Sequence, residues 1–146
     1  MIELRPATLD DHAVVLPRTR ALNRHEGIDV ADDALAAALD HLLRDPSLGG
    51  VWLIERDRAV VGYAIITFGY DLEFAGRDAW LTEIWVDPDH RGAGVAGAAL
   101  ELLAGEARRL GVRGLHLQVR PDNPAARLYH RAGFAEVPRR ILSRRL

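Results

Sequence analysis

The sequence predicts a single α+β domain over residues 1–146, built on a mixed and mostly antiparallel sheet. Three observations support this fold class. Hydrophobic residues make up 49% of the chain and charged residues 27%, which is enough for one packed core. Three strand-like runs follow one another in the middle of the chain with only turns between them, as in hairpins. A long helical pattern then separates these runs from a further strand.

The first third of the chain predicts one strand and two helices. Residues 2–5 alternate and favour a strand. Thr8, followed by two aspartates, is typical of a helix N-terminus, and the helix that follows should be kinked or broken at Pro17. A loop over residues 25–30 leads to a second helix over residues 32–44, whose leucines form one stripe.

The remaining elements rest on strand composition and on glycines that end helices. Gly111 and Gly133 each follow a helical pattern, where glycine commonly occurs. The predicted elements are strands over 51–55, 59–70 and 79–86, a helix over 95–110, a strand over 115–119, a short helix over 124–131 and two closing strands around 134–137 and 140–143. The complete order is β-α-α-β-β-β-α-β-α-β-β.

Composition excludes several classes of function. The net charge of −2 argues against a nucleic-acid partner, because such proteins usually carry a basic field. The chain has no cysteine, so thiolate metal sites and thiol nucleophiles are excluded, and its histidines show no metal-ligand grouping. No apolar run approaches the roughly 20 residues of a membrane span, and the acidic N-terminus does not resemble a signal peptide. We therefore expect a cytoplasmic protein with no membrane partner and no metal.

The segment RGAGVAGAAL, which begins at Arg91, contains Gly92, Gly94 and Gly97 in the spacing of a dinucleotide-binding turn. That turn requires its first glycine directly after a strand, but five residues separate Val86 from Gly92. The chain that remains is also too short for two mononucleotide-binding halves. A nicotinamide or flavin oxidoreductase is therefore disfavoured.

The same segment still predicts an anion site. A glycine-rich turn that leads into a helix directs backbone N–H groups at an anion, and the helix dipole strengthens that attraction. Arg91 adds a permanent cation with forked donors. The alternative is an ordinary glycine turn, but the combination of a strand, an arginine, two glycines and a helix favours anion binding.

The sequence resembles the GNAT superfamily of N-acetyltransferases. The run that begins at Arg91 is similar to the family's R/Q-x-x-G-x-G/A pyrophosphate loop, and WVDPDHRG is similar to the V-x-P-x-x-R-G run that precedes it. PDNPAARLYHRAGF, which ends at Phe134, resembles the signature N-x-x-A-x-x-L-Y-x-x-x-G-F. The resemblance implies the GNAT fold with splayed central strands, and acetyl transfer from acetyl-CoA to a primary amine by direct attack in a ternary complex.

The resemblance also implies roles for individual residues. Trp85 and Val86 would offer backbone groups to the pantetheine arm, and Asn123 would contact the cofactor. Tyr129 would protonate the departing thiolate. The pyrophosphate would be held by Arg91, Gly92, Ala93, Gly94, Val95 and Ala96.

Two positions depart from the family pattern. Asn123 lies six residues before Tyr129 where seven is common, so either Asn123 or Asp122 takes the asparagine's role. Gln118 stands where some relatives carry a glutamate base. Glu83, a carboxylate among large apolar residues of a strand, is the candidate general base, since such carboxylates tend to mark sites; the alternative is a solvent-facing residue on an alternating strand. His116 and Gln118 are otherwise interpreted as packing residues.

The acceptor is not named by the sequence. Acidic residues around the expected acceptor side favour a small cationic amine, although a solvated acidic surface is the alternative; they are Glu26, Asp29, Asp32, Asp33, Asp71, Glu73 and Glu83. A protein amine is a second acceptor class, and a homodimer is compatible with the chain. The alternative function is a non-catalytic acyl-CoA-binding regulatory module of the same fold.

Overall fold

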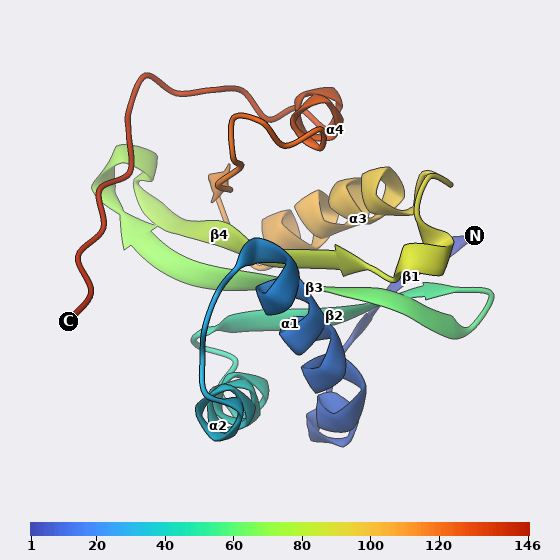
Figure 1. Cartoon of the computed structure of the whole chain (residues 1–146). Helices are drawn as coiled ribbons and strands as arrows, with labels where there is room; N and C mark the ends of the chain where they lie inside the picture. Colours follow the sequence, from blue (N-terminus) through green and yellow to red (C-terminus); the bar gives the residue numbers. More distant parts are fainter.

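The computed structural model describes all 146 residues and places helices on both faces of one five-stranded sheet (Figure 1). In chain order the elements are β1 (Ile2–Pro6), α1 (His12–Glu26), α2 (Asp32–Arg44), β2 (Gly49–Arg56), β3 (Ala59–Asp71), β4 (Gly76–Val86), α3 (Val95–Arg109), β5 (Leu115–His116) and α4 (Ala126–Arg131). Short 3-10 helices cover Leu9–Asp11, Leu72–Phe74 and Pro88–His90. None of the helices has the length and apolar character that a membrane crossing requires.

The strands lie in the order β1-β2-β3-β4-β5, and the strands from β1 to β4 pair with one another in antiparallel fashion. β5 alone is parallel, to β4. The predicted mixed and mostly antiparallel sheet is therefore confirmed. Asp57 and Arg58 connect β2 to β3 with φ angles of 52° and 69°, a conformation that matches the twist of a two-residue hairpin.

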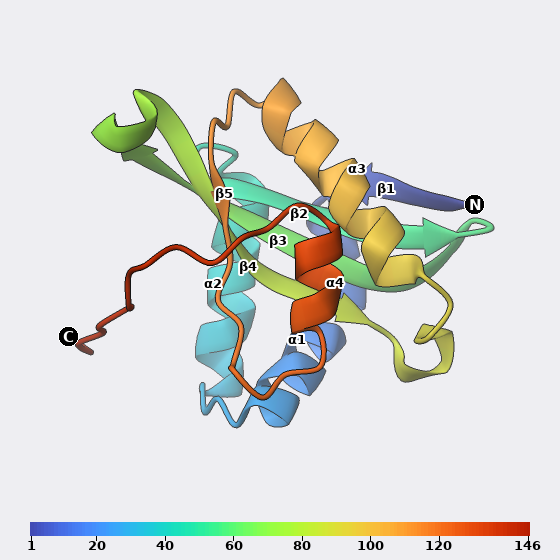
Figure 2. The same cartoon turned by 90° about the horizontal axis from the view of Figure 1, so that it is seen from above.

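Each face of the sheet has its own core. α1 and α2 cover one face, where Val15, Leu16 and Leu39 pack with buried residues of β2 and β3. α3 covers the other face, where Leu100 and Leu103 pack on β3 and β4. Figure 2 shows α4 beside α3 on this second face. A functional group on β4 can therefore face either pair of helices, depending on its register.

Helix α1 is continuous through Pro17, so of the kink or break that the sequence predicts there, the break does not occur. Proline removes the hydrogen bond to the carbonyl of Ala13, four residues earlier. Ala13 and Pro17 are both exposed, so water can bond that carbonyl at little cost.

The C-terminal part of the chain has less strand than the sequence predicts. β5 ends at His116 rather than at residue 119, and residues 134–137 and 140–143 form no strand. A closing strand needs a paired neighbour, and β5 is too short to offer one. Pro138 also lacks a backbone donor, and the arginines that follow it are exposed. The tail instead extends to the end of the β3–β4 hairpin, where Arg139 pairs with Glu73 at 2.8 Å (Figure 1).

We expect Asp11→Asn to lower the free energy of unfolding by about 1–3 kcal/mol at pH 7. Asp11 is buried and accepts hydrogen bonds from Arg5 at 2.9 and 3.0 Å and from the backbone N–H of Thr8 at 2.8 Å. The hydrogen bonds from Arg5 are the main cause that holds the pKa of Asp11 below its ordinary value. The stabilisation is therefore present above the unfolded-state pKa, about 3.9, and is lost as the pH falls through the lower pKa of the folded state.

Urea denaturation of the parent and the variant at pH 7 and near pH 3 tests this expectation. The difference between the two proteins should shrink at the acidic pH. The neighbouring exposed residue supplies a control, Asp10→Asn, which should change little at either pH. An equal loss for Asp11→Asn at both pH values would contradict a charge-dependent role.

Candidate active site

A glycine turn leads into the N-terminus of α3. Gly92 and Gly94 have φ angles of +77° and +78°, which residues with a side chain rarely adopt. Gly94 is the N-cap of the helix. No other atom lies within 4 Å of the place where a Cβ would stand at either glycine. The turn is exposed from Arg91 to Gly94, whereas Val95 is buried in the core and can offer only its backbone. The turn is therefore open to close approach by a ligand.

The first amides of α3 have no acceptor in the protein. The first hydrogen bond of the helix runs from the N–H of Ala98 to the carbonyl of Gly94, which leaves the N–H groups of Val95, Ala96 and Gly97 unpaired. No side chain caps this end of the helix. Three free donors, the helix dipole and the guanidinium of Arg91 together make a strong anion site.

A slot separates β4 from β5 beyond their short pairing. Only Ala79 with Leu115 and Trp80 with His116 are paired, although β4 continues to Val86. The N–H of Asp87 bonds the carbonyl of Val61 on β3, so the backbone groups of Val86, one residue earlier, point away from β3 and into the slot. The N–H of Val86 therefore faces the slot without a partner, as the resemblance predicts for splayed strands, while the Val86 carbonyl accepts a hydrogen bond from Arg91.

A β-bulge at Thr82 decides which face Glu83 occupies. Glu83 lies opposite Ile65, whereas Leu81 lies opposite the next residue, Ile66, so Thr82 is an extra residue in β4. Leu81 packs into the core beneath α3. Without the bulge, strict alternation would turn the carboxylate of Glu83 into that same core. The bulge instead turns it toward the face covered by α1.

Glu83 is half-buried, and its carboxylate Oε1 accepts a hydrogen bond of 2.6 Å from the hydroxyl of Tyr63. Burial raises the pKa of Glu83 above its ordinary value, and the Tyr63 hydrogen bond lowers it by a smaller amount. A carboxylate with a raised pKa is better matched to accepting a proton near neutral pH. Glu83 therefore has the burial and electrostatics of a general base.

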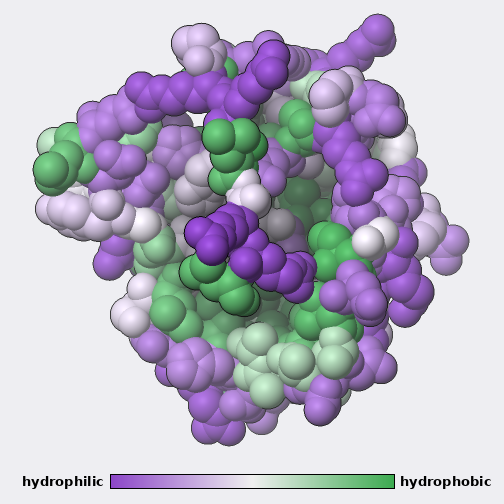
Figure 3. Space-filling view, turned by 60° about the vertical axis from the view of Figure 1, so that its left-hand side comes forward, coloured by the Kyte–Doolittle hydropathy of each residue, from purple (hydrophilic) through white to green (hydrophobic).

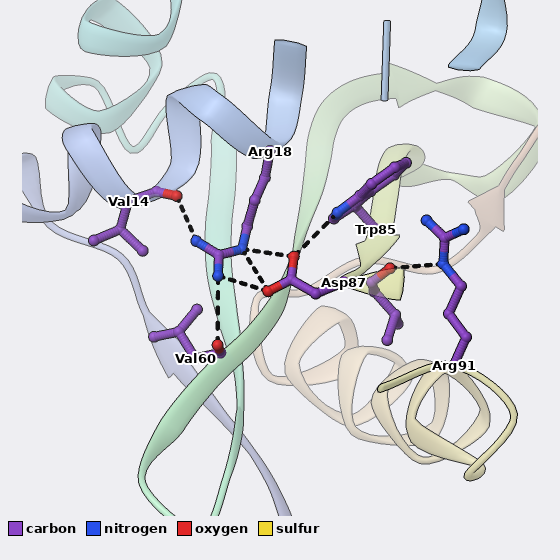
Figure 4. Close-up of polar contacts among 7 residues, drawn as sticks. Val14, Arg18, Val60, Trp85, Asp87 and Arg91 are labelled. Atoms are coloured by element: carbon purple, nitrogen blue, oxygen red, sulfur yellow. Dashed lines mark hydrogen bonds and ion pairs between the residues drawn. The ribbon is translucent and has the colours of Figure 1, made fainter. Parts of the chain in front are cut away.

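Asp87 links α1 to the end of β4 (Figure 4). Its carboxylate accepts hydrogen bonds from the guanidinium of Arg18 at 2.7 to 3.2 Å and from the indole N–H of Trp85 at 3.2 Å. The guanidinium of Arg91 lies 4.5 Å from the Trp85 ring centroid, and its Nε donates to the carbonyl of Val86 at 2.8 Å. These contacts fix the indole and hold Arg91 at the mouth of the slot, with its two terminal nitrogens free.

Tyr129 lies on α4, across the slot from β4. Its ring packs edge-on against Phe134 and on the core beneath α3, and the hydroxyl has no hydrogen-bond partner in the protein. Burial is the main cause that raises the pKa of Tyr129, and the charge of Glu26 raises it further. The phenol is therefore protonated at neutral pH and free to donate.

Asn123 organises the start of α4. Its side-chain oxygen accepts from the N–H of Ala125 at 2.8 Å, and its carbonyl accepts from Ala126 at 3.1 Å. This oxygen is therefore occupied by the chain itself, and only the NH₂ group could donate to a ligand. Asp122 is exposed and caps nothing. Which of the two residues serves a ligand stays a prediction.

The side of the molecule in Figure 3 is hollowed, with hydrophobic side chains in and around the hollow and a hydrophilic group lying across its middle. Several acidic residues that the sequence places near the acceptor already have cationic partners. The ion pairs are Glu26 with Arg120, Asp32 with Arg20, and Glu73 with Arg139. Asp29, Asp33, Asp71 and Glu83 have no such partner. The unpaired negative charge among these residues is therefore smaller than the sequence alone indicates.

His116 has a more specific environment than simple packing. Its Nε2 lies 3.1 Å from Oδ2 of the buried Asp78, and its ring lies between Phe74 and Trp80, with both centroid distances 5.1 Å. His116 therefore stands at the closed end of the slot, where β4 and β5 are last paired. Gln118 is exposed beyond it.

The model of the acetyltransferase (GNAT) family matches residues 16–134. This range includes the whole slot, the glycine turn and α4. The chain belongs to the GNAT acetyltransferase family. Every candidate site residue, from Glu83 to Tyr129, lies within the GNAT match, and the sheet with its slot is the GNAT fold.

Solved structures agree with the GNAT fold. An integron cassette protein from the mobile metagenome of Cole Harbour Salt Marsh is 31% identical with a TM-score of 0.86, over 98% of this chain and 90% of that one. A predicted acetyltransferase from Clostridium acetobutylicum, solved with acetyl-CoA, is 21% identical with a TM-score of 0.81, over 99% and 96%. The aminoglycoside N-acetyltransferase AAC(6')-Iy, solved with CoA, is 20% identical with a TM-score of 0.81, over 99% and 95%. A comparison with curated proteins finds no match.

Sequence reasoning missed three residues of this GNAT site: Tyr63, Arg18 and Asp87. Tyr63 reaches Glu83 from a neighbouring strand, 20 residues away, and the bulge that brings them together has no sequence signal. Arg18 lies in the middle of α1 and pairs with a residue 69 positions later. Asp87 does stand inside the motif before the glycine turn, and that position could have drawn attention to it.

Proposed function

We propose that the protein transfers an acetyl group from acetyl-CoA to the nitrogen of an amine by direct attack in a ternary complex. The observation that carries this proposal is the continuity of the anion site with the slot. A ligand with a pyrophosphate at the glycine turn and an extended arm along the edge of β4 would bring its far end toward Glu83 and Tyr129.

The residues present fit acetyl-CoA. The open space over Gly92 and Gly94 and the free amides that follow suit a pyrophosphate, and the terminal nitrogens of Arg91 suit its second charge. The pantetheine arm would lie along the open edge of β4 beyond its short pairing with β5, where a neighbouring strand would otherwise lie. Its amides are the partners that an unpaired strand edge accepts.

In the proposed mechanism Glu83 takes a proton from the ammonium of the acceptor, through a water. The neutral nitrogen attacks the thioester carbonyl, and the N–H of Val86, which faces the slot, donates to the oxyanion. As the C–S bond breaks, Tyr129 gives its proton to the thiolate, and the proton shed by the new amide nitrogen returns to the tyrosinate. The products are an N-acetylated amine and free CoA.

A small cationic amine is the acceptor that we propose. Glu83 is a carboxylate without a cationic partner beside the slot, and Asp29 and Asp71 likewise form no ion pair. AAC(6')-Iy, which shares the fold, is by its name an aminoglycoside N-acetyltransferase. A protein amine, the other acceptor class, would need a groove beside the slot wide enough for a second polypeptide.

A panel of amines tests the function and its acceptor class together. We expect release of free CoA thiol with polyamines and aminoglycosides to exceed that with neutral or acidic amines. The chain has no cysteine, so a thiol reagent reports CoA alone. Reactions without an amine give the hydrolysis background, and mass spectrometry of the amine confirms the added acetyl group.

Two other outcomes would each count against part of the proposal. Faster acetylation of neutral or acidic amines would overturn the cationic class while leaving the transfer intact. Tight binding of acetyl-CoA with no thiol release for any amine or peptide would favour a non-catalytic acyl-CoA-binding module.

A further inference from the structure

The carboxylate of Glu83 accepts a hydrogen bond from Tyr63, whose ring is closely packed in the core. Tyr63 is fully buried and packs with Val15, Leu16 and Leu53 in the core beneath α1 and α2. Its hydroxyl lies 2.6 Å from Oε1 of Glu83, a short distance typical of a hydroxyl that donates to a carboxylate. The donor is therefore fixed by close packing, while its acceptor lies on the strand that borders the slot.

The pairing is asymmetric. A buried tyrosine hydroxyl needs a hydrogen-bond partner, and Glu83 supplies one. Glu83 is half-buried and has two oxygens, of which only Oε1 has a partner in the protein. The hydrogen bond at Oε1 restrains the flexible side chain of Glu83. Its second carboxylate oxygen, Oε2, therefore keeps a defined position and is free to accept a proton.

We propose that Tyr63 is the positioning residue for Glu83, fixing the carboxylate so that its second oxygen serves as the base. The inference rests on the proposed function, because it gives Glu83 a partner in that role. Tyr63 touches neither the acceptor nor acetyl-CoA and acts only through Glu83.

The electrostatic effect of Tyr63 has a definite sign. Burial raises the pKa of Glu83, and the hydrogen bond from Tyr63 opposes that rise by stabilising the carboxylate. The titratable and charged groups on the surrounding elements are Arg18, His25 and Glu26 on α1, Asp32 and Asp33 on α2, Asp87 after β4, and Arg120 and the neutral Tyr129 near α4. Tyr63 is therefore the hydrogen-bond donor that opposes the effect of burial on the pKa of Glu83.

The test is Tyr63→Phe, which removes one hydroxyl and keeps the ring. Without the hydrogen bond the pKa of Glu83 should rise, so a higher pH is needed to ionise it. The acidic limb of the kcat/KM profile should move to higher pH. At pH values on the acidic side of that limb, kcat/KM of the variant should be about tenfold or more lower than that of the parent. Glutamate labelled with ¹³C at the carboxyl carbon reports the pKa of Glu83 directly by NMR, with the signal assigned from Glu83→Gln.

The two readouts separate the two claims. A higher pKa by NMR together with a shifted limb supports the inference. A higher pKa with an unshifted limb overturns it because Glu83 is not the base, and the proposed mechanism then fails as well. An unchanged pKa in NMR overturns the positioning role and leaves the proposed function untouched.

Two further variants guard against a loss that comes from folding. Glu83→Asp keeps Tyr63 and the core intact but withdraws the carboxylate by one methylene, and it should show a comparable loss of kcat/KM. The double variant Tyr63→Phe/Glu83→Gln should be no slower than Glu83→Gln alone, because a positioning residue has nothing left to position. A further drop in the double variant would assign Tyr63 a structural role and overturn the inference.

Discussion

We expect Tyr129→Phe to lower kcat by about 10²-fold or more and to leave the Kd for acetyl-CoA nearly unchanged. Only the hydroxyl is lost, and it has no partner in the protein, while the ring keeps its contacts with Phe134 and the core. Burial and the charge of Glu26 raise the pKa of Tyr129, so the hydroxyl carries its proton throughout the neutral range. Without it, water must protonate the departing thiolate.

Single-turnover kinetics should measure this effect, because they isolate the chemical step from product release. Tyr70→Phe is a matched control, since Tyr70 is 78% exposed at the end of β3 and the same hydroxyl is removed there. The control should retain the parent rate. If Tyr129→Phe keeps more than about half of kcat with chemistry limiting, tyrosine is a packing residue and water is the acid.

The second large effect should come from Gly94→Asp, which we expect to weaken acetyl-CoA binding by at least ~100-fold. The new carboxylate would stand at the N-cap of α3, against the pyrophosphate. Two unit charges 4 Å apart at an effective dielectric constant near 20 repel by about 4 kcal/mol, which exceeds the roughly 2.7 kcal/mol that a 100-fold loss requires. The site has room for a side chain, and aspartate tolerates a positive φ better than most residues, so the variant should fold.

Gly94→Asn isolates the charge, because asparagine has the same shape and the same tolerance of this backbone conformation. Calorimetry should find binding by Gly94→Asn reduced far less than by Gly94→Asp. The difference should shrink at high salt, which screens the repulsion. Equal affinity of Gly94→Asp and the parent would place the pyrophosphate elsewhere.

The sequence predicts well the parts of the site that are local in the chain. Arg91 and the glycines after it act through their own backbone, so a short motif carries their whole geometry. The same locality explains why the helix before Gly111 was placed correctly. The slot was predicted only through the family resemblance, because the sequence pattern indicates a longer strand over residues 115–119 and the two-residue pairing appears only in the structure.

The sequence does not predict what depends on register or on distant partners. Reading β4 as an alternating strand would put Glu83 and Leu81 on one face, and the bulge at Thr82 puts them on opposite faces. The two predicted closing strands were wrong because strand propensity was counted where no neighbouring strand was available to pair. Pairing is a property of two segments, and a pattern within one segment does not contain it.

The short pairing of β5 has a consequence for stability, because a ligand bound in the slot would add contacts that the sheet itself lacks. Two residue pairs connect β4 to the segment that carries α4, so a molecule lying between β4 and α4 would serve as a removable strand. Bound at 100 times its Kd, such a molecule would stabilise the folded state by about 2.7 kcal/mol. The resistance of the C-terminal segment to local unfolding and proteolysis would then increase with the ligand concentration. Because unfolded segments are degraded first, the steady-state amount of the protein would increase with it.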